Sequence, residues 1–112
     1  MVKIYVTIAL QEQILRLFKH RSEEIFQKFR ALEIQPQKGK ALGHVGNIVI
    51  KELKMDKFRF YFITDGHVLK FGSQEELAYL LIKFIRMSEK KDQQQTIDEI
   101  KTVLRNLGDK GL

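Results

Sequence analysis

The chain has 112 residues, and its 20 Lys and Arg against 14 Asp and Glu give a formal net charge of +6. This length fits one domain with one modest core, and the absence of cysteine excludes disulfides, thiolate metal sites and a cysteine nucleophile. The positive charge favours a polyanionic partner such as nucleic acid, although a basic surface that serves only solubility is equally compatible with it.

Residues 2–8 predict a strand with one buried face, because apolar and other side chains alternate along it. Residues 10–33 then carry apolar side chains at helical spacing, with an interruption before Ser22. Ser22 is a candidate N-cap, since two glutamates follow it in the first turn. We expect two helices packed as a hairpin, with a single bent helix as the alternative.

The middle of the chain predicts hairpins. Pro36 and Gly39 end the helical region and open a loop. Residues 47–55 and 57–64 predict two strands joined by a tight turn. Asp65-Gly66 is a strong hairpin signal, and we expect the chain to return through a strand at 68–71.

The C-terminal third is ambiguous over 73–91. Ser73-Gln-Glu-Glu76 matches a capping box, which indicates a helix, but 79–87 is a continuous apolar run equally compatible with a buried strand. Residues 93–107 predict a last helix, with Asp92 as candidate cap and Gly108 as candidate stop. The resulting order β-α-α-β-β-β-(β)-α predicts an α+β domain with an antiparallel sheet and its helices on one face.

The candidate functional residues that remain, once other types of site are excluded, are basic. The three His are too scattered for metal binding, and a phosphate-binding loop, a dinucleotide fingerprint and a nucleophile elbow are missing. No run is apolar and long enough for a membrane span or a signal peptide, so we expect a cytoplasmic location and no membrane partner. Basic residues gather on the predicted central hairpin and in the later run: Lys51, Lys54, Lys57, Arg59, Lys83, Arg86, Lys90 and Lys91.

Pairing of these strands would bring several of the cations to one sheet face. Fixed positive charge there could hold an RNA phosphate and stabilise the dianionic transition state of cleavage by the neighbouring 2′-hydroxyl, with no metal or other cofactor. The simpler alternative is a solvated sheet face without a specific role.

Four short motifs occur in an order that is typical of one family. They are Pro36-Gln-Lys-Gly-Lys-Ala-Leu42, Lys51-Glu-Leu-Lys54, Lys57-Phe-Arg-Phe-Tyr-Phe-Ile63 and Phe84-Ile-Arg-Met-Ser-Glu-Lys-Lys91. Together they resemble the RelE/HigB/ParE superfamily of toxins, and the last is similar to a basic stretch of HigB-like, phage-derived members. The resemblance implies a single RelE-like domain over 1–112 with a β-α-α-β-β-β core and a helical hairpin. It also favours a short helical turn at 73–77 and a strand over 79–87, because the family places its basic stretch at the end of a central strand.

The resemblance implies the toxin of a toxin–antitoxin system, a ribosome-dependent mRNA endoribonuclease that an antitoxin protein neutralises. By position, Lys54 and Arg59 would neutralise the scissile phosphate and Arg86 would stabilise the transition state. Lys90 and Lys91 would help to hold RNA, and we expect Lys51, Lys57 and Lys83 to contribute to RNA binding.

The sequence also departs from the family pattern. Glu52 stands where many members have a strand lysine, and no Tyr or His follows Arg86 as an acid or base. The alternatives are a non-catalytic basic module that binds RNA or the ribosome, and a ParE-like gyrase inhibitor.

Overall fold

The computed structural model describes residues 2–87, 94–95, 98 and 102, with side chains in the last helix given up to Lys83. The elements in this part of the chain are β1 (Lys3–Val6), α1 (Ile8–Phe18), the 3-10 turn η1 (Lys19–Arg21), α2 (Ser22–Ala31), β2 (Lys40–Val45), β3 (Ile48–Met55), β4 (Phe58–Thr64), β5 (Val68–Gly72) and α3 (Gln74–Met87). The α+β class is as predicted. The predicted helix over 93–107 falls largely outside the described residues. No described helix is long and apolar enough to cross a membrane.

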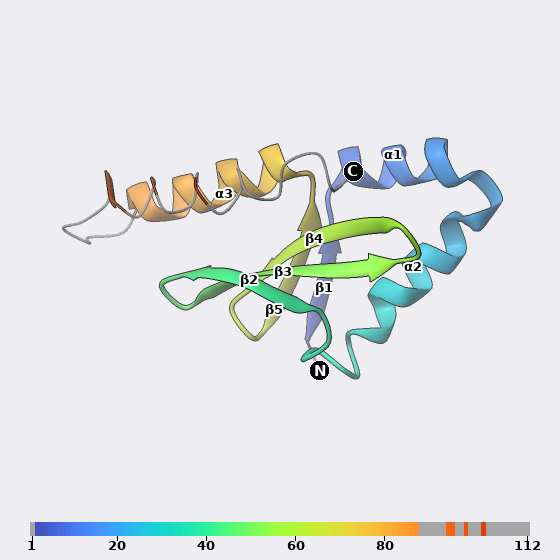
Figure 1. Ribbon diagram of the computed structural model, residues 1–112, viewed down its shortest axis with the longest axis horizontal. Helices are drawn as coiled ribbons and strands as arrows, with labels where there is room; N and C mark the ends of the chain where they lie inside the picture. Colours follow the sequence, from blue (N-terminus) through green and yellow to red (C-terminus); the bar gives the residue numbers. More distant parts are fainter. Residues whose placement is uncertain (1, 88–93, 96–97, 99–101, 103–112) are drawn as a thin grey trace.

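The five strands form one twisted sheet in the order β1-β5-β4-β3-β2 (Figure 1). Strands β2 to β5 pair antiparallel as successive hairpins, whereas β1 pairs parallel with β5. The prediction of an antiparallel sheet is therefore wrong at this edge. The direction in which two strands pair across 60 or so residues is a tertiary property, and the alternation within β1 carries no information about it.

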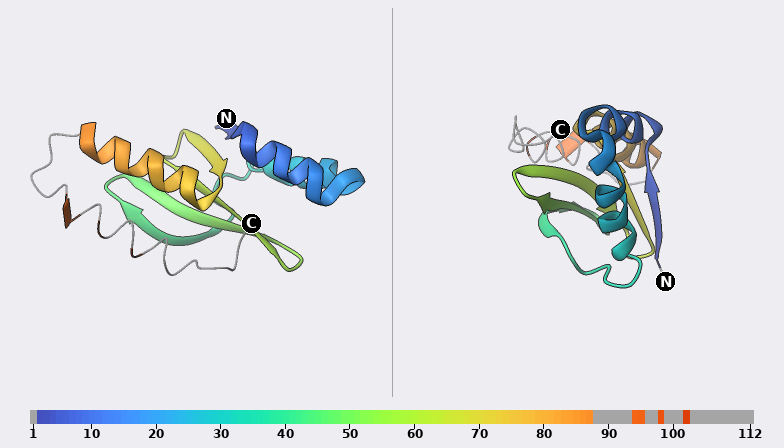
Figure 2. Two further views of the ribbon diagram at one scale, coloured as in Figure 1. Left: turned by 90° about the horizontal axis from the view of Figure 1, so that it is seen from above. Right: turned by 90° about the vertical axis from the view of Figure 1, so that its right-hand side faces the viewer.

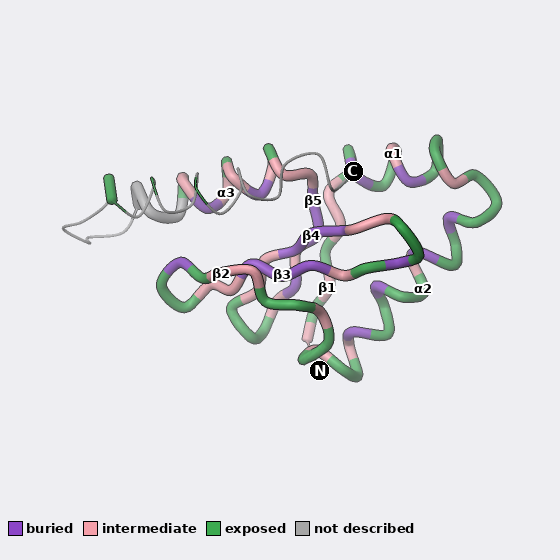
Figure 3. Tube along the Cα trace, viewed as in Figure 1, coloured by how far each residue is buried: buried purple, intermediate pink, exposed green. Residues whose placement is uncertain are grey.

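One face of the sheet packs against α1 and α2 through aromatic side chains. The ring of Phe29, on α2, stacks on Phe71 of β5 with 4.0 Å between centroids and meets Phe60 of β4 edge-on at 5.3 Å. Alternation along β4 sends Phe58, Phe60 and Phe62 to this side. Figure 3 shows the buried residues concentrated in the central strands and on the inner sides of the helices.

Helix α3 covers part of the opposite face. Leu77 packs against Tyr61, and Leu81 packs against Val45 and Ile50. The sheet therefore lies between α3 on one side and α1 and α2 on the other. In the right-hand view of Figure 2, α1 and α2 are nearest the viewer and α3 is the more distant, fainter helix. The prediction that all helices lie on one face is wrong.

The prediction of a strand over 79–87 is also wrong, since α3 is one continuous helix. Its start is the predicted capping box: the Ser73 backbone N–H donates to the Glu76 carboxylate at 3.0 Å, and the Glu76 N–H donates to the Ser73 hydroxyl at 3.1 Å. The apolar residues Leu77 and Leu81 are one helical turn apart and both reach the sheet. A helix buries this run on one side, which a continuous apolar sequence does not reveal.

The remaining strand, β2, was not predicted. It is an edge strand whose register shifts between Ala41 and Gly43, where a bulge interrupts the alternation that would have indicated it. The predicted N-cap is wrong as well. Ser22 is the first residue of α2, and Arg21 precedes it in the cap position. The buried Ser22 hydroxyl donates to the Ile14 carbonyl at 3.1 Å, so that it ties α2 to α1 across the η1 corner.

Candidate functional site

Two cations lie side by side on the part of the sheet that α3 leaves uncovered. Lys54 on β3 is directly opposite Arg59 on β4 in the antiparallel register, and directly opposite residues project from the same face. Lys54 is exposed, and 32% of the Arg59 side chain is accessible to solvent. The resulting cation pair belongs to the same face as α3 but lies near the β3–β4 turn.

A carboxylate and a tyrosine occupy the next row of the same face. Glu52 is directly opposite Tyr61 across the β3–β4 pair and directly opposite Lys40 across the β2–β3 pair. We call Lys40, Glu52, Lys54, Arg59 and Tyr61 the β3–β4 surface cluster. Glu52 is 7% exposed although it carries a charge, so the protein has to compensate the loss of its hydration.

The compensation for Glu52 is a loose contact with Arg59. One guanidinium nitrogen, Nη1, lies 3.4 Å from each of the two carboxylate oxygens. Charge-assisted N–H···O bonds are usually about 2.7–2.9 Å long, and the strong arginine–carboxylate contacts use two nitrogens. Among the described residues, Arg59 makes no other hydrogen bond, so most of its N–H groups are available to a ligand.

The Tyr61 hydroxyl is buried without a hydrogen-bond partner among the described residues. The residue is 2% exposed and packs beneath Leu77. Burial raises the pKa of its hydroxyl, the charge of Glu52 raises it further, and the charge of Arg59 acts in the opposite direction. The hydroxyl therefore lies within the electrostatic reach of both charged neighbours and stays protonated at neutral pH.

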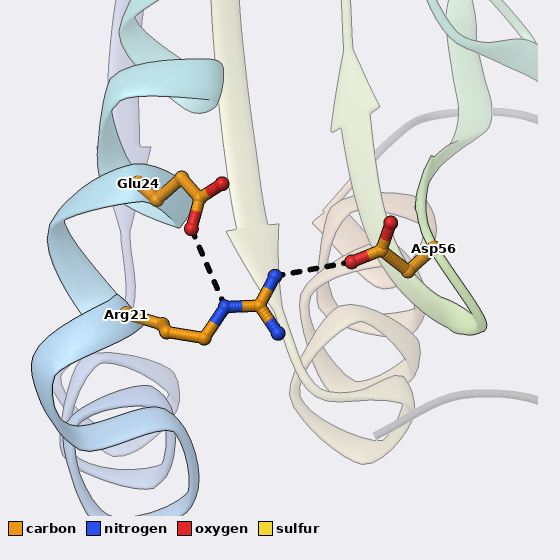
Figure 4. A network of polar contacts seen from close by, with 3 residues as sticks. All are labelled: Arg21, Glu24 and Asp56. Carbon is orange, nitrogen blue, oxygen red and sulfur yellow. Dashed lines mark hydrogen bonds and ion pairs between the residues drawn. The ribbon is translucent and has the colours of Figure 1, made fainter.

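The turn that follows Lys54 is attached to the helical corner. The Arg21 guanidinium donates to the Asp56 carboxylate at 3.1 Å and to Glu24 at 3.4 Å (Figure 4). Asp56 has a positive φ of 55° in this turn. The contact bridges the start of α2 and the β3–β4 turn, and it holds the end of the hairpin that carries the cation pair.

The other predicted RNA-binding lysines do not join the cluster. Lys51 projects to the α1–α2 face, where it donates to the Gln37 carbonyl at 3.1 Å and burial lowers the pKa of its amine. Lys57 lies in the β3–β4 turn, with its amine 5.8 Å from the centre of the Phe58 ring. Lys83 is exposed on α3. Lys90 and Lys91 lie outside the described residues.

Arg86 lies at the far end of the face from Lys54 and Arg59. Leu77, near the start of α3, contacts Tyr61, whereas Leu81 contacts Val45 and the first half of β3. The helix thus runs away from the β3–β4 turn and toward the β2–β3 turn, as Figure 1 shows. Arg86 is in the last turn of α3, so its backbone lies toward the β2–β3 turn, whereas Lys54 and Arg59 lie beside the β3–β4 turn. The side chain of Arg86 lies outside the described residues, so its convergence with Lys54 and Arg59 on one phosphodiester stays a prediction.

Sequence reasoning missed Lys40 and Tyr61 as members of the cluster, and it treated Glu52 only as a departure from a pattern. The alternation of β3 and β4 could have placed Glu52 and Tyr61 beside Arg59, whereas Lys40 depended on the strand β2 that was not predicted. Within the described part of the chain, no group of His, Asp or Glu is arranged to hold a metal ion. Comparisons with family models, with curated proteins and with solved structures find no match to this chain.

Proposed function

We propose that this protein binds RNA through the β3–β4 surface cluster and acts as a non-catalytic RNA- or ribosome-binding module of the RelE/HigB-like type. The observation that carries the proposal is the register of the central hairpin, which sets Lys54 directly opposite Arg59 on a part of the sheet that none of the described helices covers. Lys40 adds a third cation on the neighbouring strand. The net charge of +6 attracts a polyanion from a distance.

The order of the elements supports the likeness to the superfamily. A first strand, two helices and the meander β3-β4-β5 occur in this order along the chain, and apart from β2 and α3 this is the β-α-α-β-β-β order that the resemblance implies. Strand β2 precedes the meander as an additional edge strand. The likeness in turn supports the ribosome and its mRNA as the RNA partners, and an antitoxin protein as the partner that blocks the surface.

The arrangement favours binding over cleavage. The residues expected to cut RNA include Arg86, which is in the last turn of α3, whereas the cation pair lies beside the β3–β4 turn. The Glu52 carboxylate also partly neutralises the positive charge of Arg59 through their ion pair. A surface with two exposed lysines and one partly neutralised arginine can hold phosphates, but it concentrates less charge on a single transition state.

A metal-independent ribonuclease is the second candidate, and the specific observation that favours it is Glu52. Its carboxylate lies beside Arg59, so it could take the proton of a 2′-hydroxyl as that oxygen forms a bond to the phosphorus that Arg59 holds. The bond from the phosphorus to the 5′-oxygen then breaks, and water protonates the leaving 5′-oxygen. This mechanism would use the same residues with different roles, and it does not need Arg86.

Titration of a fluorescent single-stranded RNA with the protein at increasing salt tests both candidates. Three phosphate contacts predict that the logarithm of the association constant falls by roughly 2 per logarithmic unit of salt. The same samples, with EDTA in the arm without ribosomes and with Mg²⁺ in the arm with ribosomes, are then resolved by size. Bound, intact RNA supports the binding module. Cleavage that disappears in Arg59→Met supports the ribonuclease, and the absence of salt-dependent binding rejects both.

A further inference from the structure

The least explained polar group in the described part of the chain is the Tyr61 hydroxyl. It is buried, it lies directly opposite Glu52 across the hairpin, and no described atom accepts or donates a hydrogen bond to it. A buried hydroxyl without a partner is costly. Because this unpaired hydroxyl lies beside a buried carboxylate, we looked for a state of the protein in which the two groups form a hydrogen bond.

Glu52 would lose its hydrogen-bonding partner in the RNA-bound state. Its side chain is 8% exposed, and Arg59 at 3.4 Å is its only hydrogen-bonding partner among the described residues. Most N–H groups of Arg59 are available, but a phosphate bound on the exposed side of the sheet would draw the whole guanidinium outward and break its loose contact of 3.4 Å with Glu52. The carboxylate would then remain buried and unpaired, and this cost would oppose RNA binding.

We propose that Tyr61 is a positioning residue that donates its hydroxyl to Glu52 when a bound RNA phosphate draws Arg59 away. The inference rests on the proposed RNA-binding function and adds an exchange of partners to it: Glu52 pairs with Arg59 in the free protein and with Tyr61 in the complex. The exchange needs only side-chain rotation, because Glu52 and Tyr61 are already cross-strand neighbours on one face. No proton is transferred, and Tyr61 does not touch the RNA.

The hydroxyl has the properties that this role requires. The raised pKa of Tyr61, caused first by burial and then by the Glu52 charge, keeps it a donor throughout the neutral range. Glu52 as an ionised carboxylate only accepts, so donor and acceptor are complementary. Lys40, exposed on the other flank of Glu52, is a competing partner, and the experiment has to separate the two.

Tyr61→Phe removes the hydroxyl and nothing else, so the inference predicts opposite effects on stability and binding. The midpoint of urea unfolding should stay the same or rise, because the free protein loses only an unpaired polar group. The affinity for a fluorescent single-stranded RNA should fall by roughly 2- to 12-fold, the range expected for one hydrogen bond. A loss of stability in Tyr61→Phe would mean that the hydroxyl already has a partner and would overturn the exchange.

A double-mutant cycle with Glu52→Leu identifies the partner. Glu52→Leu removes both the charge and the hydrogen-bond acceptor, so Tyr61→Phe in that background should no longer weaken RNA binding, whereas Lys40→Met should leave the effect of Tyr61→Phe intact. An equal effect of Tyr61→Phe with and without the Glu52 charge contradicts the inference, and so does an unchanged affinity of the single variant.

Lys54→Met is measured alongside as a control on the proposed function. If Lys54→Met does not weaken RNA binding, the proposed function itself fails. If Lys54→Met weakens binding and Tyr61→Phe does not, only the exchange of partners fails.

Discussion

The hydroxyl of Thr7 donates a hydrogen bond of 2.8 Å to the carboxylate of Glu76, although 69 residues separate them. The same hydroxyl accepts the Leu10 N–H and caps α1, and the same carboxylate accepts the Ser73 N–H in the capping box of α3. One hydrogen bond therefore joins the first turns of two helices that lie on opposite faces of the sheet.

Glu76 should make the stability of the protein depend on pH. Burial raises the pKa of its carboxyl, but the hydrogen bonds from Ser73 and Thr7 outweigh burial and hold it below its ordinary value of 4.5. A carboxyl whose pKa is lowered by folding stabilises the protein above the unfolded-state value, and the contribution is lost as the pH falls through the folded-state pKa. Glu76→Gln should flatten the fall of the urea-unfolding midpoint below about pH 4.5.

Glu75→Gln is the matched control for this experiment, because Glu75 is an exposed carboxylate in the same first turn of α3. It should retain the acid sensitivity of the wild type. If the urea-unfolding midpoints of Glu76→Gln and the wild type fall equally at low pH, the contacts of Glu76 are not the cause of the loss of stability in acid.

The aromatic core should depend strongly on the Phe29–Phe71 stack. Phe71 is fully buried between Phe29 and Phe62, with ring centroids 4.0 Å and 4.6 Å away. Phe71→Ala should therefore lower the free energy of unfolding by about 3–5 kcal/mol, measured by urea denaturation. Phe26→Ala, at a half-buried ring on the rim of the same core, should cost clearly less. Similar losses for the two variants would argue against a core centred on β5.

Gly39 fixes the loop that leads into β2. Its φ is +101°, and a Cβ there would lie 3.1 Å from the Phe62 ring and 3.2 Å from the Glu52 carbonyl oxygen. Gly39→Ala should lower the free energy of unfolding by more than about 1 kcal/mol, since backbone strain and a steric clash combine. Gly66→Ala is the control, because its φ of +98° is nearly the same but no atom lies within 4 Å. We expect a smaller loss of unfolding free energy for Gly66→Ala. Equal losses in the two variants would mean that backbone strain alone, and not the steric clash, destabilises Gly39→Ala.

Arg86 and Arg59 should behave as independent residues. They lie toward opposite ends of the α3-covered face, and effects of distant substitutions usually add within about 0.5 kcal/mol. The effects of Arg86→Gln and Arg59→Met on RNA affinity should therefore add in the double variant when expressed as free energies. A coupling clearly larger than this would place both side chains at one phosphate, contrary to the course of α3.

The parts of the fold that follow from local rules could be predicted from the sequence. The alternation in β1, β3 and β4, the Asp65-Gly66 hairpin and the Ser73–Glu76 capping box all lie where expected. The Asp65 carboxylate accepts the N–H groups of His67 and Val68, which explains the strength of that turn signal. These features depend on neighbouring residues alone.

The predictions that were wrong concern features that depend on tertiary contacts. The run over 79–87 is part of a helix whose residues Leu77 and Leu81 pack against the sheet. The bulge at Ala41–Gly43 interrupts the alternation that would have indicated β2. The adjacency of Lys54 and Arg59 followed from a tight turn between two strands, so it could be predicted. The position of Arg86 could not be predicted, because the resemblance placed it on a strand over 79–87, whereas this part of the chain is the helix α3.

The most direct test of the RNA-contact surface compares two exposed lysines that differ in position and not in charge. Lys54 belongs to the β3–β4 surface cluster, whereas Lys28 is exposed on α2, across the sheet. Each is replaced by methionine, and the affinity for single-stranded RNA is measured against salt. We predict that Lys54→Met reduces the affinity and lowers the magnitude of the salt slope by about 0.7, while Lys28→Met leaves both close to the wild type. Equal effects of the two substitutions would show that net charge alone attracts RNA, and would contradict a defined surface at Lys54 and Arg59.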